Sequence, residues 1–271
     1  MSVELRELQL LELDILREFI RVCDKHSLRY YIVGGTLLGA VRHGGFIPWD
    51  DDIDVAMPRK DYEKFAELSP EELRPGYFYQ APGTDPYYFL SYAKIRKENT
   101  FLFEERFQNA RFHRGVFIDI FPLDFCPKRG AVCHLLFNTL AVMNYRGQVD
   151  SGEKYEPYTE LTGKLGYLFL RLYSPAGLTA LRKRLLRLSR RLSDGSVLAA
   201  YSGAYGYRKE VFPQEWFGEP RQIVFEDLTA AAPHESEALL NQLYGDYSQL
   251  PPTAQRVCHA DLSRTYIGDI S

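Results

Sequence analysis

Four aspartates follow the glycine pair Gly34-Gly35 within one largely apolar stretch, GGTLLGAVRHGGFIPWDDDIDVAM, residues 34–57. Asp50, Asp51 and Asp52 are consecutive, and Asp54 follows two residues later. Carboxylates at this spacing raise one another's pKa and cost stability unless a cation lies between them. The stretch therefore predicts a site that holds a cation, and the residues around it should be arranged to support that site.

The residues before the aspartates predict a helix, a strand and a second helix. Apolar side chains recur at helical spacing over residues 5–26, which is typical of an amphipathic helix. YYIVGG, residues 30–35, is expected to form a short strand that ends in a glycine turn. We expect Thr36 to cap a short helix over residues 36–43. A glycine turn that leads into a helix offers backbone N–H groups to an anion such as a diphosphate.

The aspartates are expected on neighbouring strands. In DIDVAM, residues 52–57, apolar residues alternate with Asp52 and Asp54, so that both carboxylates point to one face. Pro58 is expected to open the next helix, where its missing N–H does no harm. A third carboxylate, Asp119, lies between apolar neighbours in the predicted strand GVFIDIFPLD.

This set of residues predicts metal-assisted phosphoryl transfer. Carboxylate oxygens are the ligands that Mg²⁺ uses together with phosphate oxygens and water, and Mn²⁺ is the alternative ion. We therefore interpret Asp52, Asp54 and Asp119 as the catalytic, metal-binding residues. Asp119 could complete the coordination or accept a proton from an attacking hydroxyl.

Four motifs resemble those of the LicD family of phosphocholine transferases, within the nucleotidyltransferase superfamily. They are GGTLLGAVRHGGFIPWDDDIDVAM, KIRKENT, FIDIFPLD and YGDYSQLPP, which together extend from residue 34 to residue 252. That family also includes the fukutin-related ribitol-phosphate transferases. The resemblance implies a transferase that uses a CDP-alcohol, delivers the phospho-alcohol to a sugar hydroxyl and releases CMP. It also implies that Asp52 and Asp54 bind the metal, that Asp119 is the third carboxylate, and that Asp50 is an acidic position before the pair.

The expected fold is α/β (α+β), with a nucleotidyltransferase-like mixed sheet core, a mostly helical insertion and a helical C-terminal part. We place the catalytic core at residues 1–126, the insertion at 127–210 and the C-terminal segment at 211–271. Further elements are expected from the local pattern: strands at 77–81, 89–97, 101–105 and 221–228, helices through 131–192 with breaks near Gly152–Pro157 and at Ser174–Pro175, and a helix at 235–247.

Several other residues are candidates for substrate binding. Gly34, Gly35 and Thr36 could hold phosphate oxygens, Arg42 could clamp a phosphate, and Asp50 lies next to the metal pair. Lys94 and Arg96 share a strand face and could neutralise the diphosphate or the charge on departing CMP.

Structural roles remain open for most of these residues. Asp51 should face away from the metal pair and could cap a turn, as could Asp50. Asp52 and Asp54 could lie on a solvated edge strand, and Asp119 could be a buried hydrogen-bond acceptor. Arg42 could pair with an aspartate, and the face that carries Lys94 could be solvated.

Composition excludes some functions. A net charge of −3 and a pI near 6.1 predict no general affinity for nucleic acid. The four cysteines have no CxxC spacing and are interpreted as reduced thiols, so that a zinc site from Cys133-His134 and Cys258-His259 is the minor alternative. The N-terminal residues do not resemble a signal peptide and no apolar run is long enough to span a membrane, which favours a cytoplasmic protein.

A basic segment suggests contact with the inner face of the cell membrane. Residues 164–192 carry eight Lys or Arg and no acid, with leucines at helical spacing in the second half. A basic amphipathic helix of this kind can lie on anionic lipid, although it could equally pack on the core with a solvated basic face.

The predicted partners are a CDP-alcohol donor and a glycan or lipid-linked oligosaccharide acceptor of lipopolysaccharide or teichoic acid biosynthesis. Phosphocholine is the first choice, and its ammonium group should lie against aromatic rings, with Trp49, Tyr87, Tyr88 and Tyr92 as candidates. The alternatives are ribitol, glycerol or ethanolamine phosphate, a true nucleotidyltransferase, or a non-catalytic relative that binds a membrane or a partner.

Overall fold

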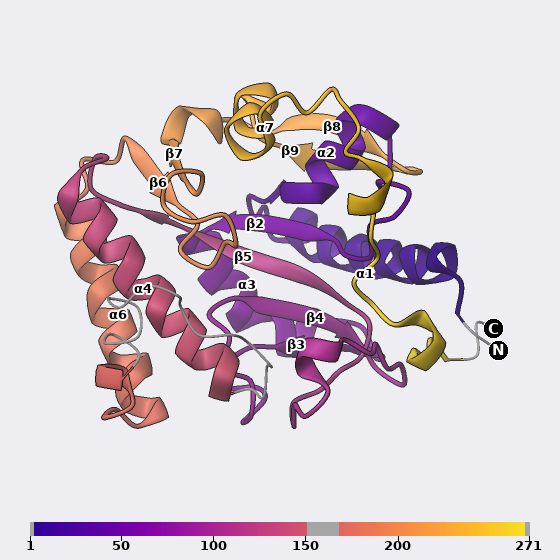
Figure 1. Cartoon of the computed structure of the whole chain (residues 1–271), viewed down its shortest axis with the longest axis horizontal. Helices are drawn as coiled ribbons and strands as arrows, with labels where there is room; N and C mark the ends of the chain where they lie inside the picture. Colours follow the sequence, from indigo (N-terminus) through magenta and orange to yellow (C-terminus); the bar gives the residue numbers. More distant parts are fainter. Residues whose placement is uncertain (1–2, 151–167, 269–271) are drawn as a thin grey trace.

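The computed structural model describes residues 3–150 and 168–268. Its centre is a mixed sheet (Figure 1), ordered β1-β2-β5-β4-β3, with β6 and β7 continuing from the end of β5. Its strands are β1 (Tyr31–Ile32), β2 (Asp54–Pro58), β3 (Tyr77–Gln80), β4 (Ala93–Lys97), β5 (Phe117–Phe125), β6 (Val197–Ala199) and β7 (Val211–Pro213). Only the β2–β5 pair is parallel in this sheet. The expected mixed α/β fold is confirmed.

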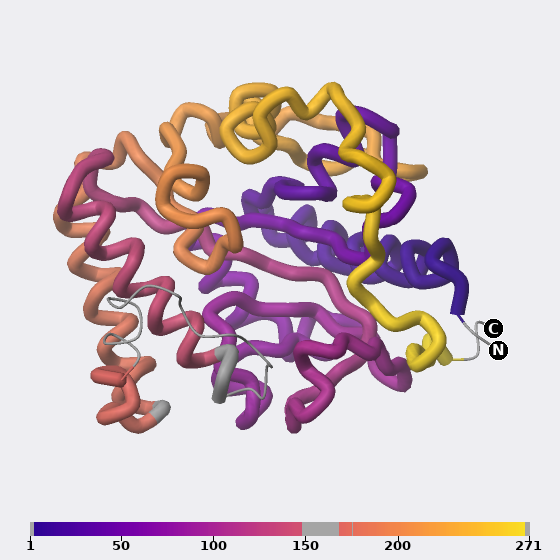
Figure 2. The backbone as a smooth tube through the Cα atoms, in the orientation of Figure 1, coloured from indigo at the N-terminus to yellow at the C-terminus, as the bar shows by residue number. Residues whose placement is uncertain are grey.

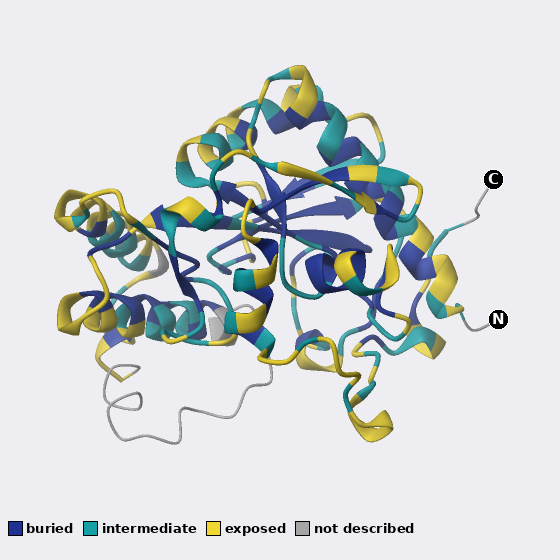
Figure 3. Cartoon of the chain, turned by 90° about the horizontal axis from the view of Figure 1, so that it is seen from above, coloured by how far each residue is buried: buried dark blue, intermediate teal, exposed yellow. Residues whose placement is uncertain are grey.

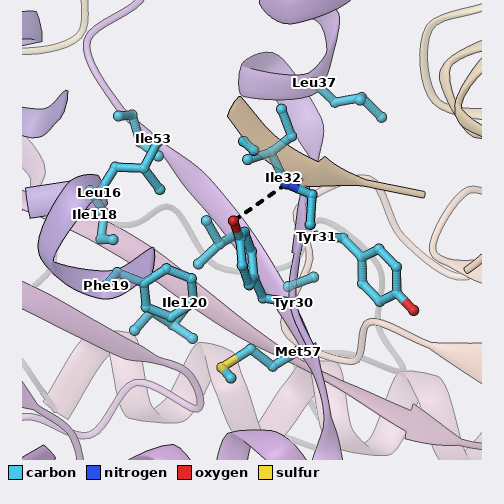
Figure 4. Close-up of a cluster of buried hydrophobic side chains, with 14 of the residues drawn as sticks. Leu16, Phe19, Tyr30, Tyr31, Ile32, Leu37, Ile53, Met57, Ile118 and Ile120 are labelled. Atoms are coloured by element: carbon cyan, nitrogen blue, oxygen red, sulfur yellow. Dashed lines mark hydrogen bonds between the residues drawn. The ribbon is translucent and has the colours of Figure 1, made fainter. Parts of the chain in front are cut away.

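Two helices cover one face of the sheet and form the main core. They are α1 (Leu5–Lys25) and α3 (Arg59–Glu72), and both contact β5. Leu16 and Phe19 of α1 pack with Ile118 and Ile120 of β5, as Figure 4 shows. These side chains are fully buried, and each such burial contributes roughly 1.5–3 kcal/mol. The apolar residues that alternate with Asp52, Asp54 and Asp119 therefore fix which sheet face the carboxylates occupy.

A smaller unit covers the β1 edge of the sheet. It consists of α2 (Gly34–His43), the hairpin β8 (Arg221–Phe225) and β9 (Leu228–Ala232), and α7 (Ser236–Tyr244). From α7 the chain runs back along the molecule, through η3 (Thr253–Gln255) and η4 (Leu262–Arg264), to bridge Phe101 and Glu104 (Figure 2). The two remaining short helices are η1 (Glu105–Phe107) and η2 (Gln214–Trp216).

Two long helices pack together beside the far end of β5. They are α4 (Ala131–Asp150) and α6 (Pro175–Leu192). Apolar side chains of both helices form a second hydrophobic cluster with Ala199 of β6 and Val211 of β7. The Ser174 hydroxyl caps α6 by accepting a hydrogen bond from the Gly177 N–H at 3.2 Å. The outer faces of these helices are largely exposed, whereas the sheet strands are largely buried (Figure 3).

Several expected boundaries differ from the structure. The helix expected from Thr36 begins at Gly34, with Val33 as its N-cap, so Thr36 is not a cap. The strand expected at 101–105 makes only two isolated bridges. The strand expected at 221–228 turns at Glu226, whose φ is 58°, into a hairpin. The C-terminal part therefore contains strands besides one α-helix, because its apolar residues pair with each other and pack on β1. The expected break at Gly152–Pro157 lies outside the described residues.

Candidate active site

Asp54 and Asp119 lie directly side by side in the sheet. β2 and β5 are parallel with Asp54 opposite Asp119, and the Asp119 N–H donates to the Ile53 carbonyl at 2.8 Å. Both carboxylates, together with Asp52, line a cavity of about 750 Å³, which we call the acidic pocket. The sequence-based prediction that these three residues come together is therefore matched by the geometry, although β2 begins at Asp54 and Asp52 lies just before it.

The folded protein disfavours the ionised forms of Asp52 and Asp54. Burial, with the charges of Asp50 and Asp119 adding to it, raises the pKa of Asp52 to about 8. Burial and the charge of Asp52 raise the pKa of Asp54 well above its ordinary value, and burial raises the pKa of Asp50 to about 6. Within the part of the chain that the structure describes, no side chain forms an ion pair with Asp52 or Asp54. A solvated edge strand is excluded, because β2 is flanked by β1 and β5.

Asp119 differs from the other two because it has a cationic partner. Lys94 Nζ lies 2.5 Å from Asp119 Oδ1, and the Lys94 side chain is wholly buried. The ammonium is also 3.2 Å from the centroid of the Phe117 ring. Burial lowers the pKa of Lys94 and raises that of Asp119, and in each case the charge of the other residue opposes the shift. Lys94 therefore neutralises Asp119, and its strand face is not solvated.

Arg96 does not reach the acidic pocket. Its side chain is fully buried, where Nε donates to Gln80 Oε1 at 2.7 Å and Nη1 donates to the Gly115 carbonyl at 2.6 Å. The guanidinium also lies 4.6 Å from the Phe117 ring centroid. Arg96 thus ties β4 to the β3 edge and to the start of β5, and it is not among the residues that line the pocket.

The glycine pair lets α2 approach the carboxylates closely. A Cβ on Gly34 would lie 2.7 Å from Asp54 Oδ2, and a Cβ on Gly35 would lie 2.6 Å from Asp50 Oδ2. Gly34 also has a φ of 57° and lines the acidic pocket. The Thr36 hydroxyl accepts a hydrogen bond from the Asp54 N–H at 2.8 Å, so Thr36 positions the start of β2.

Gly34→Ala should destabilise the protein more than an equivalent change at Gly44. Gly44 ends α2 with a φ of 72°, and a Cβ there would meet no heavy atom within 4 Å, so Gly44→Ala introduces backbone strain only. We expect that strain to cost about 1–2 kcal/mol at either position. Gly34→Ala should lose a further ~1–3 kcal/mol through the contact with Asp54. Urea unfolding measures both, and equal losses would contradict the close approach.

Arg42 and Asp51 make contacts with the C-terminal segment. Arg42 Nη1 donates to the Tyr247 carbonyl at 3.2 Å, and it forms no ion pair with an aspartate among the described residues. Asp51 is buried and accepts hydrogen bonds from the Ala260 N–H at 2.5 Å and from His259 Nδ1 at 3.3 Å. Asp51 therefore faces away from the Asp52–Asp54 pair, as expected, and holds the C-terminal segment rather than a local turn.

The acidic pocket is also lined by polar residues that the sequence pattern does not place there, among them Asn144, Arg106, Glu210 and His259. Arg106 forms an ion pair with Glu104 at 2.7 Å and brings a cation to the pocket. Burial raises the pKa of Glu210 to about 7. These residues come from segments far from the aspartates, and no local motif marks them.

Aromatic rings line the same pocket, as the donor hypothesis requires. Tyr92 and Phe121 have ring centroids 4.6 Å apart, and Tyr145 and Tyr205 contribute from other walls. Of the other candidates, Tyr88 is wholly buried against Phe112, and neither it, Tyr87 nor Trp49 lines the pocket.

The Asp52–Asp54 pair fits a divalent cation that keeps ligands from substrate and water. Over residues 3–150 and 168–268, no three His, Cys, Asp or Glu side chains converge on a preformed metal site. The zinc alternative is thus not supported, and Cys133 Sγ lies instead 3.6 Å from Cys126 Sγ. Mg²⁺ commonly takes one or two protein carboxylates and completes its shell with phosphate and water. The role of Asp119 as a third ligand stays a prediction, because its carboxylate already contacts Lys94.

The mixed sheet with Asp54 and Asp119 on adjacent strands, Asp52 beside them and a glycine pair at the start of α2 defines a nucleotidyltransferase-like domain. Residues 27–149 match the family model described as LicD/FKTN/FKRP, nucleotidyltransferase domain, and this segment is a domain of that family. The chain is also 29% identical over 270 residues to the lipopolysaccharide cholinephosphotransferase LicD of Haemophilus influenzae, a match that covers 95% of this chain and 96% of that protein.

Shorter matches fall on other relatives. Human ribitol 5-phosphate transferase FKRP is 40% identical over 52 residues, which is 19% of this chain and 10% of that protein. An uncharacterized protein of Rickettsia typhi is 38% identical over 63 residues, or 23% of this chain and 20% of that one. The prediction of a LicD-type enzyme is supported by these matches. The helices formed by the described residues include none with the length and apolarity needed to cross a bilayer.

Proposed function

We propose that this protein transfers phosphocholine from CDP-choline to a sugar hydroxyl of a lipopolysaccharide or a similar cell-surface glycan, with release of CMP. The observation that supports this most directly is the pairing of Asp54 with Asp119, with Asp52 in the same pocket. The name of the Haemophilus relative favours choline as the alcohol and lipopolysaccharide as the acceptor.

In this proposal Mg²⁺, or Mn²⁺, is held by Asp52 and Asp54. When bound, the ion neutralises the pair and withdraws charge from the donor diphosphate. Asp50 lies beside this pair and adds to its negative charge.

The remaining residues position the donor and move one proton. A bond forms between the sugar oxygen and the phosphorus that bears choline, while the bond from that phosphorus to CMP breaks. Asp119 accepts the proton of the sugar hydroxyl, and the Lys94 ammonium keeps Asp119 ionised. Arg106 balances the charge on departing CMP. Tyr92 and Phe121 offer ring faces to the choline ammonium.

Ribitol phosphate is the second candidate group, because part of the chain is similar to a ribitol 5-phosphate transferase. The two alcohols differ in charge: choline is a cation that prefers aromatic faces, whereas ribitol is neutral and needs hydrogen-bond partners. The aromatic lining of the acidic pocket therefore favours choline.

The reaction is proposed to take place on the cytoplasmic side of the membrane. The basic face of α6, with exposed Arg184 and Arg191, would bring the protein to anionic lipid where a lipid-linked acceptor is available.

The test measures CMP release with a panel of donors. The full-length protein is incubated with Mg²⁺, lipopolysaccharide and CDP-choline, CDP-ribitol, CDP-ethanolamine or CDP-glycerol. We expect CMP to form fastest from CDP-choline and the reaction to stop when EDTA is added. CTP with diphosphate release is the matched assay for a true nucleotidyltransferase.

Three outcomes would contradict the proposal. Undiminished activity in EDTA would exclude the metal, and diphosphate release from CTP would indicate nucleotidyl transfer. CMP release from none of the CDP-alcohols would favour a non-catalytic relative.

A further inference from the structure

A second cavity of about 770 Å³ lies between α3, α4, α6 and the end of β5, and we call it the α6 pocket. Among the described residues that line it, seven are cationic, whereas only Glu63 and Asp124 are acidic. The cations come from the residues before β1, from α3 and from α6: Arg29, Arg59, Lys60, Arg182, Lys183, Arg187 and Arg190. None of these residues has been given a role in the donor chemistry above.

Asp124, one of the two acidic residues that line the α6 pocket, is already neutralised. Arg59 forms a bidentate pair with Asp124, with Nε–Oδ1 and Nη2–Oδ2 distances of 2.8 and 2.6 Å. Of the remaining cations, Arg29 pairs with the exposed Glu219 at 3.0 Å. In the described part of the chain, Lys60, Lys183, Arg187 and Arg190 form no ion pair. A cavity with such an excess of positive charge selects an anion.

Arg182 is the strongest single feature of the α6 pocket. Its guanidinium is partly buried and, within residues 3–150 and 168–268, donates only to neutral oxygens, Asn144 Oδ1 and, at 3.5 Å, Ser202 Oγ. No carboxylate among the described residues pairs with it. Burial, with the nearby charge of Arg59 adding to it, lowers the pKa of Arg182 to about 10, as expected for a cation without its own counter-ion.

The α6 pocket adjoins the acidic pocket through a shared wall. Leu123 and Phe217 line both cavities. Asn144 and Ser202, the two partners of Arg182, line the acidic pocket, while Arg182 itself lines the α6 pocket. A ligand held by Arg182 would therefore lie one side chain away from the cavity that contains the carboxylates.

The lining also includes surfaces suited to a sugar. Tyr62, Tyr79 and Phe89 also line the cavity, and Ser91 and Thr179 add hydroxyl groups. Aromatic faces with a few polar groups bind sugar rings, and clustered Arg and Lys bind phosphate. We propose that the α6 pocket binds a phosphorylated sugar, the anionic part of the acceptor glycan. The binding of a phosphorylated sugar follows from the pocket alone, whereas its role as acceptor rests on the proposed function.

Spacing on α6 provides matched variants. Lys183 and Arg187 are four residues apart and line the pocket, whereas Arg184 and Arg191 are exposed on the same helix and do not line it. Lys183→Gln/Arg187→Gln and Arg184→Gln/Arg191→Gln therefore remove the same charge from the same helix. Arg182→Gln tests the partly buried cation. The exposed pair Lys183 and Arg187 keeps the proposal testable if Arg182→Gln does not fold.

The experiment measures binding of glucose 6-phosphate by calorimetry in EDTA, which removes any metal from the acidic pocket. We expect Lys183→Gln/Arg187→Gln and Arg182→Gln each to weaken binding by about tenfold or more, as for loss of charge-assisted hydrogen bonds. Arg184→Gln/Arg191→Gln should bind like the wild type. Glucose should not bind, and inorganic phosphate should bind more weakly than glucose 6-phosphate. If lipopolysaccharide competes with glucose 6-phosphate, the natural ligand is a phosphorylated sugar within a glycan. If it does not compete, the natural ligand is a free sugar phosphate.

Several results would overturn the inference. One is that the wild type does not bind glucose 6-phosphate. Another is that Lys183→Gln/Arg187→Gln and Arg184→Gln/Arg191→Gln lose the same affinity for it. A third is that the wild type binds inorganic phosphate and glucose 6-phosphate equally well. The protein could instead bind phosphatidylglycerol vesicles through Lys183, Arg184, Arg187 and Arg191 and fail to bind glucose 6-phosphate. That result would show that this face of α6 binds membrane and not a sugar phosphate. If glucose 6-phosphate binds as expected but no CDP-alcohol yields CMP, the proposed function fails while the α6 pocket stands.

Discussion

Asp54→Asn should abolish transfer and, at the same time, stabilise the metal-free protein. Loss of one of two carboxylates that hold the cation should lower CMP release about a thousandfold or more, roughly 4 kcal/mol of transition-state stabilisation. Asn has nearly the same size as Asp but no charge, so the cavity keeps its shape. Donor assays with CDP-choline and Mg²⁺ measure the loss, and Asp52→Asn should behave alike.

The stabilisation follows from the direction of the pKa shifts. The folded protein raises the pKa of Asp54 and Asp52 above their ordinary values, so over the intervening pH range it binds more protons than the unfolded chain. Stability therefore falls as pH rises through that range, from about pH 4 to pH 8. Asp54→Asn should remove part of this fall and gain about 1–3 kcal/mol in EDTA near pH 8, with little gain near pH 5.

Urea unfolding in EDTA at the two pH values measures this effect. Asp227→Asn is the control, because it removes an exposed carboxylate that pairs with Arg17 at the surface. It should not stabilise the protein. Added Mg²⁺ should raise the stability of the wild type most at the higher pH and that of Asp54→Asn hardly at all. If Asp54→Asn destabilised the metal-free protein at high pH, the ionised carboxylates of Asp52 and Asp54 would not be destabilising the folded state.

The acidic cluster could be predicted because its signal is local. Alternation within a strand decides which face a side chain occupies, so Asp52 and Asp54 could be placed together from six residues. Asp119 could be joined to them because its strand shows the same alternation. The apolar neighbours Ile53, Val55, Ile118 and Ile120 are all fully buried, which is why the pattern is reliable here.

The rest of the acidic pocket depends on contacts between segments that are distant in the sequence, and no local pattern predicts such contacts. His259 reaches Asp51 from 208 residues away, and Arg106 and Glu210 arrive from a 3-10 turn and a loop end. Lys94 and Arg96 look alike in sequence, two residues apart on one strand face. The partners opposite them, Asp119 for Lys94 and Phe117 for Arg96, give them different surroundings. Sequence alternation predicts a face, but it does not predict which strand lies next to it.

The basic segment shows the same limit. The leucines at helical spacing are Leu178, Leu181, Leu185, Leu188 and Leu192. The first three pack against the second hydrophobic cluster, whereas Leu188 and Leu192 are exposed. The helix could not be assigned to core or membrane from sequence, because both need one apolar and one basic face. In the structure the basic side divides between the α6 pocket and the exposed surface, a division that depends on where α3 and β5 lie.

Lys94→Met should destabilise the protein severely, by about 3–5 kcal/mol, because it leaves the Asp119 carboxylate buried without its counter-ion. Asp119 is only 6% exposed and cannot regain its charge partner from solvent. The double variant Lys94→Met/Asp119→Asn removes both charges and should recover more than half of the lost stability. Both variants should lack transfer activity, since Asp119 is either protonated or absent.

Urea unfolding of Lys94→Met, Asp119→Asn and the double variant gives the coupling energy between the two charges. Lys97→Met is the matched control on the same strand, because Lys97 pairs with Asp14 at 2.8 Å near the surface. Loss of that partly exposed pair should cost less than about 1 kcal/mol. Failure of the double variant to recover stability would mean that Lys94 supports the sheet by packing rather than by charge.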